Sequence, residues 1–106
     1  LPYVIDYNSK EEKAAARYAK ISELLGLNFI SEIYAAKELR NMVKKLKEDL
    51  DMPACLKETG ISEVEFLASI EALAATAMKD PCTKTNPRVP TRDDIENLFK
   101  KAYYGG

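Results

Sequence analysis

The chain has 106 residues, of which 46% are hydrophobic and 31% are charged, enough for one compact domain, 1–106, with a core of its own. Its 16 basic and 17 acidic residues nearly cancel, which gives no electrostatic reason to expect a nucleic-acid partner. No apolar run reaches the roughly 18 to 20 residues that cross a bilayer, so no membrane association is expected.

The first segment is apolar and reads "LPYVIDYN". Its β-branched and aromatic residues are compatible with a strand, and a helix end is equally consistent. The segment has no initiator Met, no charged leader region and no cleavage signature. We therefore expect it to lie in the interior of a longer polypeptide.

The first predicted long helix begins at "SKEE", where Ser9 and Glu12 have the spacing of a capping box. Ala14, Tyr18, Ile21 and Leu25 follow at spacings of 4, 3 and 4 and predict its buried face. Gly26 is the predicted end, because glycine adopts the left-handed conformation at little cost.

The second helix is predicted from about Ser31 to Leu50, and Pro53 prevents it from continuing. Its predicted buried stripe is Leu39, Met42, Val43, Leu46 and Leu50.

A second capping box, Ser62 to Glu65, predicts a third long helix that is rich in alanine. We expect this helix to lie near the centre of the fold, with these residues buried: Phe66, Leu67, Ile70, Leu73, Ala74 and Ala77. Thr91 begins the last helix, whose predicted inner face is Ile95, Leu98, Phe99 and Ala102. The prediction is an all-α bundle of about five helices.

Few residues could carry chemistry. Histidine is absent, which removes the commonest general base and the commonest transition-metal ligand. Cys55 and Cys82 lack CxxC spacing, so a reduced, cytoplasmic protein is expected. Cys82 is more interesting as part of "DPCTKTNPRVPT", residues 80–91, but a nucleophilic cysteine needs a base beside it.

That segment resembles the carboxyl-terminal end of the iron-containing alcohol dehydrogenases, which have an Asp-x-Cys-x-x-x-Asn-Pro-Arg pattern followed by Pro-Thr and a short helix. Three more stretches are similar to the family in the same order: "LPYVIDYN", "RYAKISELLGL" and "LKETGISEVEFLASIEALAATAMKD". The terminal "AYYG" is most similar to the alcohol dehydrogenase half of bifunctional aldehyde–alcohol dehydrogenases.

The resemblance implies the distal part of a dehydroquinate synthase-like helical domain. The parent enzyme would interconvert aldehydes and primary alcohols with NAD(P) and Fe²⁺ or Zn²⁺. The metal ligands and the nucleotide-binding domain would precede this chain, which would hold no cofactor and be inactive alone. Cys82, Thr83 and Asn86 would line the substrate cleft, with Pro87 and Arg88 anchoring the loop.

The expected partners are the rest of the parent enzyme, a small alcohol or aldehyde, and further copies of the protein. The alternative is an independent helical module that binds another protein through its apolar opening segment and its alanine-rich helix.

Overall fold

The computed structural model describes all residues, 1–106, and contains α-helices and one 3₁₀ helix but no strand. In chain order the elements are α1 (Pro2–Asn8), α2 (Glu12–Leu24), α3 (Glu32–Asp49), the 3₁₀ helix η1 (Leu56–Thr59), α4 (Glu63–Lys79), α5 (Pro81–Lys84) and α6 (Arg92–Tyr104). The all-α prediction is confirmed, and the opening segment, left open between strand and helix, is helical. The α-helix beyond the five predicted ones is α5, a single turn within residues 80–91. No helix combines the length and the apolar character that crossing a bilayer requires.

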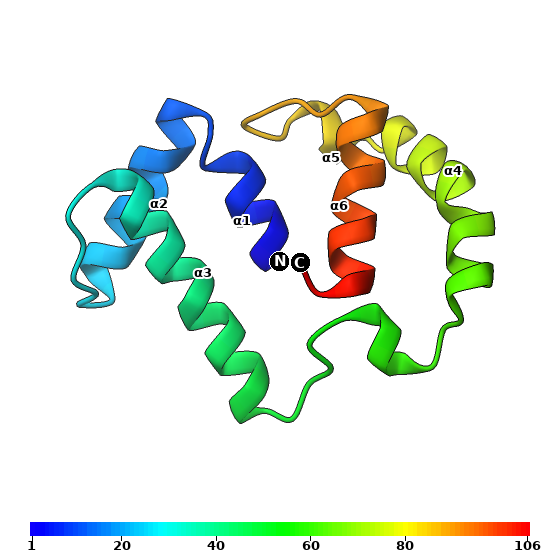
Figure 1. Ribbon diagram of the computed structural model, residues 1–106. Helices are drawn as coiled ribbons and strands as arrows, with labels where there is room; N and C mark the ends of the chain where they lie inside the picture. The colour runs from blue at the N-terminus through cyan, green and yellow to red at the C-terminus, as the bar shows by residue number, and fades with distance from the viewer. The chain divides into compact units, whose positions relative to one another are not determined.

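The chain falls into two compact units, Leu1–Met52 and Pro53–Gly106. In the first unit, α3 packs against both α2 and α1 (Figure 1). The residues buried between these helices are mostly small: Ala14, Ala15, Ala19 and Ser22 of α2, and Ala35 and Ala36 of α3. Small side chains allow two helix backbones to approach closely. At the centre, the Ser22 hydroxyl donates to the carbonyl oxygen of Ala35 at 2.7 Å.

The predicted start and buried face of α2 are partly wrong. Ser9 instead follows α1, where its hydroxyl donates to the carbonyl oxygen of Asp6 at 2.8 Å. Glu11 is the N-cap of α2, and its carboxylate accepts from the N–H of Ala14 at 2.7 Å. Of the predicted face, Ala14 is buried, whereas Ile21 and Leu25 are 43% and 48% exposed. The prediction for the end is confirmed, because Gly26 has a φ of +72°.

The predicted range of α3 is confirmed within one residue at each end, but its predicted buried stripe is largely wrong. Leu39 is buried, whereas Met42, Leu46 and Leu50 are 41%, 56% and 62% exposed. The buried residues of α3 all lie between positions 35 and 39, where the alanines meet α2. The second half of the helix therefore carries an exposed apolar row.

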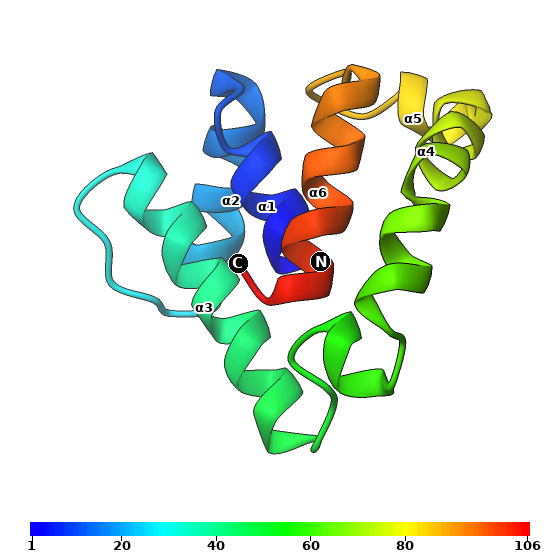
Figure 2. The same ribbon diagram turned by 45° about the vertical axis from the view of Figure 1, so that its right-hand side comes forward.

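In the second unit, α6 packs against α4, and η1 lies at the C-terminal end of α6 in both views (Figure 1, Figure 2). Phe66 and Ile70 of α4 form the core with Tyr103 of α6, and Phe99 packs on them. The rings of Phe66 and Tyr103 stack with centroids 4.3 Å apart and an interplanar angle of 6°. The Tyr103 hydroxyl donates to the carbonyl oxygen of Ile61 at 2.8 Å.

The predicted start of α4 is confirmed, since Ser62 caps it by accepting from the N–H of Glu65 at 3.2 Å. Its predicted buried face is partly wrong. Leu67 and Leu73 are 45% and 42% exposed, and only Phe66, Ile70 and Ala74 are buried. Thr91 and Asp94 form a capping box that begins α6 as predicted.

The aromatic cluster of α4 and α6 predicts a loss of stability at alkaline pH. Burial raises the pKa of the Tyr103 phenol above its ordinary value of 10.0, and the nearby negative charge of Glu63 adds to the rise. The pKa of Tyr104 is also raised, mainly because its hydroxyl donates to the Glu63 carboxylate at 2.6 Å. Each phenol has a higher pKa in the folded chain than in the unfolded chain. Its contribution to stability is therefore complete at pH values below the pKa of the unfolded chain. It is lost as pH rises through the pKa of the folded chain.

We therefore expect the free energy of unfolding, measured by urea denaturation, to fall as pH rises above 10.0. Tyr104→Phe removes one of the two phenols and should make this fall shallower. An alkaline profile that is identical with and without Tyr104→Phe would contradict the assignment.

Candidate functional site

Residues 80–91 form two short turns between α4 and α6. Asp80 ends α4 and also caps α5, because its carboxylate Oδ1 accepts from the N–H of Cys82 at 2.8 Å. Pro81 occupies the first helical position, where its missing N–H has no cost. The Thr83 hydroxyl reaches back and donates to the carbonyl oxygen of Ala77, in the last turn of α4, at 2.6 Å. These side-chain bonds hold the turn α5 against the end of α4.

The second turn leads into α6. The side-chain amide of Asn86 donates to the carbonyl oxygen of Arg88 at 2.7 Å, which closes the loop around Pro87. Pro87 is exposed, Arg88 is half-buried, and Pro90 is buried immediately before the N-cap Thr91. The polar groups of this segment therefore serve mainly to fix its own backbone.

The predicted site residues differ in how far their side chains are exposed to solvent. The thiol-bearing Cys82 is exposed, whereas Thr83 and Asn86 are half-buried. Since the hydroxyl hydrogen of Thr83 is used by Ala77, its oxygen can only accept a hydrogen bond from another group. The structure brings Cys82 and Thr83 together on one turn and places Asn86 in the next.

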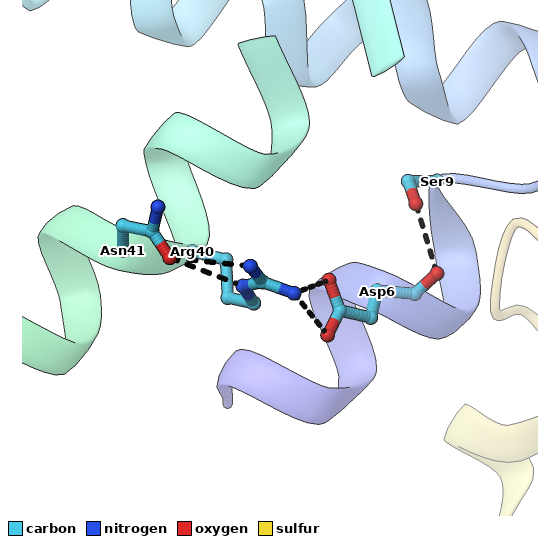
Figure 3. Close-up of polar contacts among 4 residues, drawn as sticks. All are labelled: Asp6, Ser9, Arg40 and Asn41. Atoms are coloured by element: carbon cyan, nitrogen blue, oxygen red, sulfur yellow. Dashed lines mark hydrogen bonds and ion pairs between the residues drawn. The ribbon is translucent and has the colours of Figure 1, made fainter. Parts of the chain in front are cut away.

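A second polar constellation, not predicted from the sequence, joins α1 to α3 (Figure 3). Arg40 Nη1 donates to both carboxylate oxygens of Asp6 at 3.0 Å, as the dashed lines in Figure 3 show. The rest of the guanidinium donates to Asn41 Oδ1, from Nε at 3.3 Å and from Nη2 at 3.2 Å. No local pattern could have indicated this pair, because its two residues belong to different helices.

Nearby, Asn8 is only 4% exposed, and its side-chain amide donates to the Tyr18 hydroxyl at 3.2 Å. This bond joins the end of α1 to α2. The sequence signal was present in "LPYVIDYN", where Asn8 is the one neutral amide in a run that is apolar or aromatic apart from Asp6.

Arg40→Ala should lower the free energy of unfolding by about 0.5–1 kcal/mol, because the ion pair with Asp6 is partly buried and water weakens it only in part. The side chains of Arg40 and Asp6 are 25% and 35% exposed. The loss of stability, measured by urea denaturation, should be smaller at raised salt concentration, because dissolved ions screen a pair that is partly exposed to solvent. The matched control is Lys45→Ala, which breaks the well-exposed pair with Asp49 on the same helix and should have no measurable effect. Equal losses for both variants would contradict a stabilising role for the Arg40 pair.

No group of three or more His, Cys, Asp and Glu side chains lies close enough together to hold a metal ion. Adjacent acids such as Asp93 and Asp94 act at the start of α6, where Asp94 accepts from the N–H of Thr91 at 2.9 Å. The arrangement offers an exposed thiol on a turn fixed by hydrogen bonds, and the adjacent carboxylate of Asp80 accepts from the Cys82 N–H.

A sequence model of the Fe-containing alcohol dehydrogenase family, C-terminal part, matches residues 1–103. An NADPH-dependent butanol dehydrogenase of Clostridium saccharobutylicum is 38% identical over 105 residues, which cover 99% of this chain and 26% of that protein. An alcohol dehydrogenase of Thermococcus barophilus is 36% identical over 104 residues, covering 98% of this chain and 25% of that protein. A bifunctional aldehyde-alcohol dehydrogenase of Escherichia coli is 36% identical over 95 residues, covering 88% of this chain and 11% of that protein. The chain thus spans about a quarter of the first two relatives.

Proposed function

The chain belongs to the iron-containing alcohol dehydrogenase family, as the C-terminal part of its helical domain, and on this basis we propose that it completes an NAD(P)-dependent alcohol dehydrogenase. The reaction would transfer a hydride between a primary alcohol and the nicotinamide, with release of a proton. The observation that carries the proposal is the family match over residues 1–103. The names of all three relatives include an alcohol-oxidising activity, and one specifies NADPH.

The residues of this chain do not fit a metal site, because they include no histidine and no cluster of three ligating side chains. We assign no step of the reaction to a metal held by residues 1–106. In this proposal Fe²⁺ or Zn²⁺ and NAD(P) are bound by polypeptide outside them. The relatives offer room for such sites, since about three quarters of the butanol dehydrogenase lies outside its match to this chain.

Within the proposed enzyme, α5 and the following turn would form part of the substrate cleft. Cys82, which is exposed, would contact the alcohol or aldehyde as an apolar surface and not as a nucleophile. Thr83 and Asn86 would line the cleft beside it. Pro87 and Arg88 would anchor the loop, which the Asn86 amide closes by its bond to the Arg88 carbonyl.

The decisive experiment compares the complete gene product with the 106-residue chain. Both are supplied with Fe²⁺ or Zn²⁺ and assayed for reduction of NAD or NADP with ethanol and butan-1-ol. The complete protein should turn over and the 106-residue chain should not. Turnover by the isolated chain, or none by the metal-loaded complete protein, would refute the proposal.

Enlarging residue 82 provides a more local test. Cys82→Leu in the complete protein should lower kcat/KM for butan-1-ol about tenfold, because added methylenes compete with the substrate for space. Lys84→Leu is the matched control, since Lys84 is exposed on the same turn and is not proposed to touch the substrate. If both variants behave like the unsubstituted protein, Cys82 does not line the cleft.

One observation favours the alternative of a protein-interaction module, namely the exposed apolar row Met42, Leu46 and Leu50 on α3. The dehydrogenase proposal assigns this row to contact with the remaining polypeptide. The turnover comparison separates the two functions. If the chain were an interaction module, neither the complete protein nor the 106-residue chain would oxidise the alcohols.

A further inference from the structure

Both backbone polar groups of Cys82 are bonded to side chains of its neighbours, although its own side chain is exposed. Its N–H donates to the Asp80 carboxylate at 2.8 Å. Its carbonyl oxygen accepts from the Thr85 hydroxyl at 3.1 Å and from the Thr85 N–H at 3.3 Å. These bonds fix the backbone at Cys82 and therefore the direction of its Cα–Cβ bond, from which the thiol projects.

The turn α5 cannot hold its shape through helical cooperativity. It spans only Pro81–Lys84, and helices this short are unstable without outside support. That support comes from Asp80 at its start and from Thr83, whose hydroxyl donates to Ala77 O at 2.6 Å. The Ala77 carbonyl also accepts from the N–H of Asp80 at 3.2 Å, so both residues bond to the same last turn of α4.

We propose that Asp80 and Thr83 are positioning residues, which orient Cys82 in the substrate cleft through α5 without a requirement for the charge of Asp80. This inference rests on the proposed function, because it assumes that Cys82 contacts the alcohol. It assigns to Asp80 the role of a hydrogen-bond acceptor for the Cys82 N–H. It assigns to the Thr83 hydroxyl the role of joining α5 to α4.

The test uses two pairs of variants in the complete protein. Asp80→Ala and Thr83→Val remove the two hydrogen bonds, whereas Asp80→Asn and Thr83→Ser retain an acceptor and a hydroxyl of similar reach. Amide hydrogen exchange of the peptide that contains residues 81–86 should accelerate about tenfold or more in the first pair only, because exchange reports local opening. The ratio of kcat/KM for butan-1-ol to that for ethanol should change about tenfold in the first pair and be restored in the second.

Two control variants alter similar groups elsewhere. Thr76→Val removes a threonine hydroxyl that donates to the Ala72 carbonyl at 2.9 Å within α4. Asp93→Ala removes an exposed acid from the first turn of α6. Neither should change the exchange of residues 81–86 or the substrate ratio.

The result that overturns the inference is an unchanged substrate ratio in active Asp80→Ala and Thr83→Val proteins, even if their exchange or melting temperature changes. That outcome would leave the two residues a purely structural role. If the unsubstituted complete protein had no alcohol dehydrogenase activity, the proposed function itself would be refuted instead. Failure of Asp80→Asn to restore the ratio would also overturn the inference, since the charge and not the hydrogen bond would then matter.

Discussion

Phe66→Ala should lower the free energy of unfolding by about 3–5 kcal/mol, the range for large-to-small changes of buried aromatic residues. Phe66 is 4% exposed and stacks on Tyr103 at a centroid distance of 4.3 Å, so the change removes a ring that both helices share. The ring of Tyr104 is also nearly perpendicular to that of Phe66, at an interplanar angle of 88° and a centroid distance of 6.5 Å. Urea denaturation monitored by circular dichroism measures this free energy of unfolding. The comparison requires that the dependence of the free energy on urea concentration is the same in both proteins.

The matched control is Leu67→Ala, on the next position of α4. Leu67 is 45% exposed, so its truncation should cost less than about 1 kcal/mol. Similar losses for the two variants would mean that α4 buries a different face from the one described. A loss at Phe66 below that at Leu67 would contradict the stacked pair as the centre of this core.

Ala35→Leu should lower the free energy of unfolding by about 1–3 kcal/mol, and by more if the helices cannot separate. Ala35 is 0% exposed, and its carbonyl accepts the Ser22 hydroxyl at 2.7 Å. A larger side chain must therefore push α2 away from α3 and stretch that hydrogen bond. Alanine and leucine have similar helix propensities, so the loss would report packing and not helix formation.

Ala16→Leu on α2 makes the same chemical change at an exposed position. It should alter the free energy of unfolding by no more than about 0.5 kcal/mol. The comparison needs only urea denaturation of the two variants beside the unsubstituted chain. If Ala35→Leu proved as harmless as Ala16→Leu, the close approach of α2 and α3 would be disproved.

The resemblance carried by residues 80–91 predicts Cys82, Thr83 and Asn86 as residues that line the substrate cleft, and this assignment stays a prediction. What the sequence did not indicate is how those residues are used. Asp80 and Thr83 bond to backbone groups in two adjacent helices. The Arg40 pair with Asp6 also escaped prediction, because its partners approach only when α1 and α3 pack together.

The ends of the helices were determined by the sequence itself, because capping involves residues within a few positions of one another. Ser62, Thr91 and Gly26 act where they were expected. The error at Ser9 has a local cause as well, since its hydroxyl bonds to Asp6 and leaves Glu11 to cap α2.

The buried faces were decided only by the tertiary structure. Periodicity shows which residues of one helix share a side, but burial depends on where a second helix touches it. On α3 the contact falls on Ala35 and Ala36, so the leucines at 46 and 50 are exposed. On α6, Tyr103 is 1% exposed because Phe66 and the Ile61 carbonyl meet it from distant parts of the chain. Burial of this kind depends on pairs of residues that no single stretch of sequence contains.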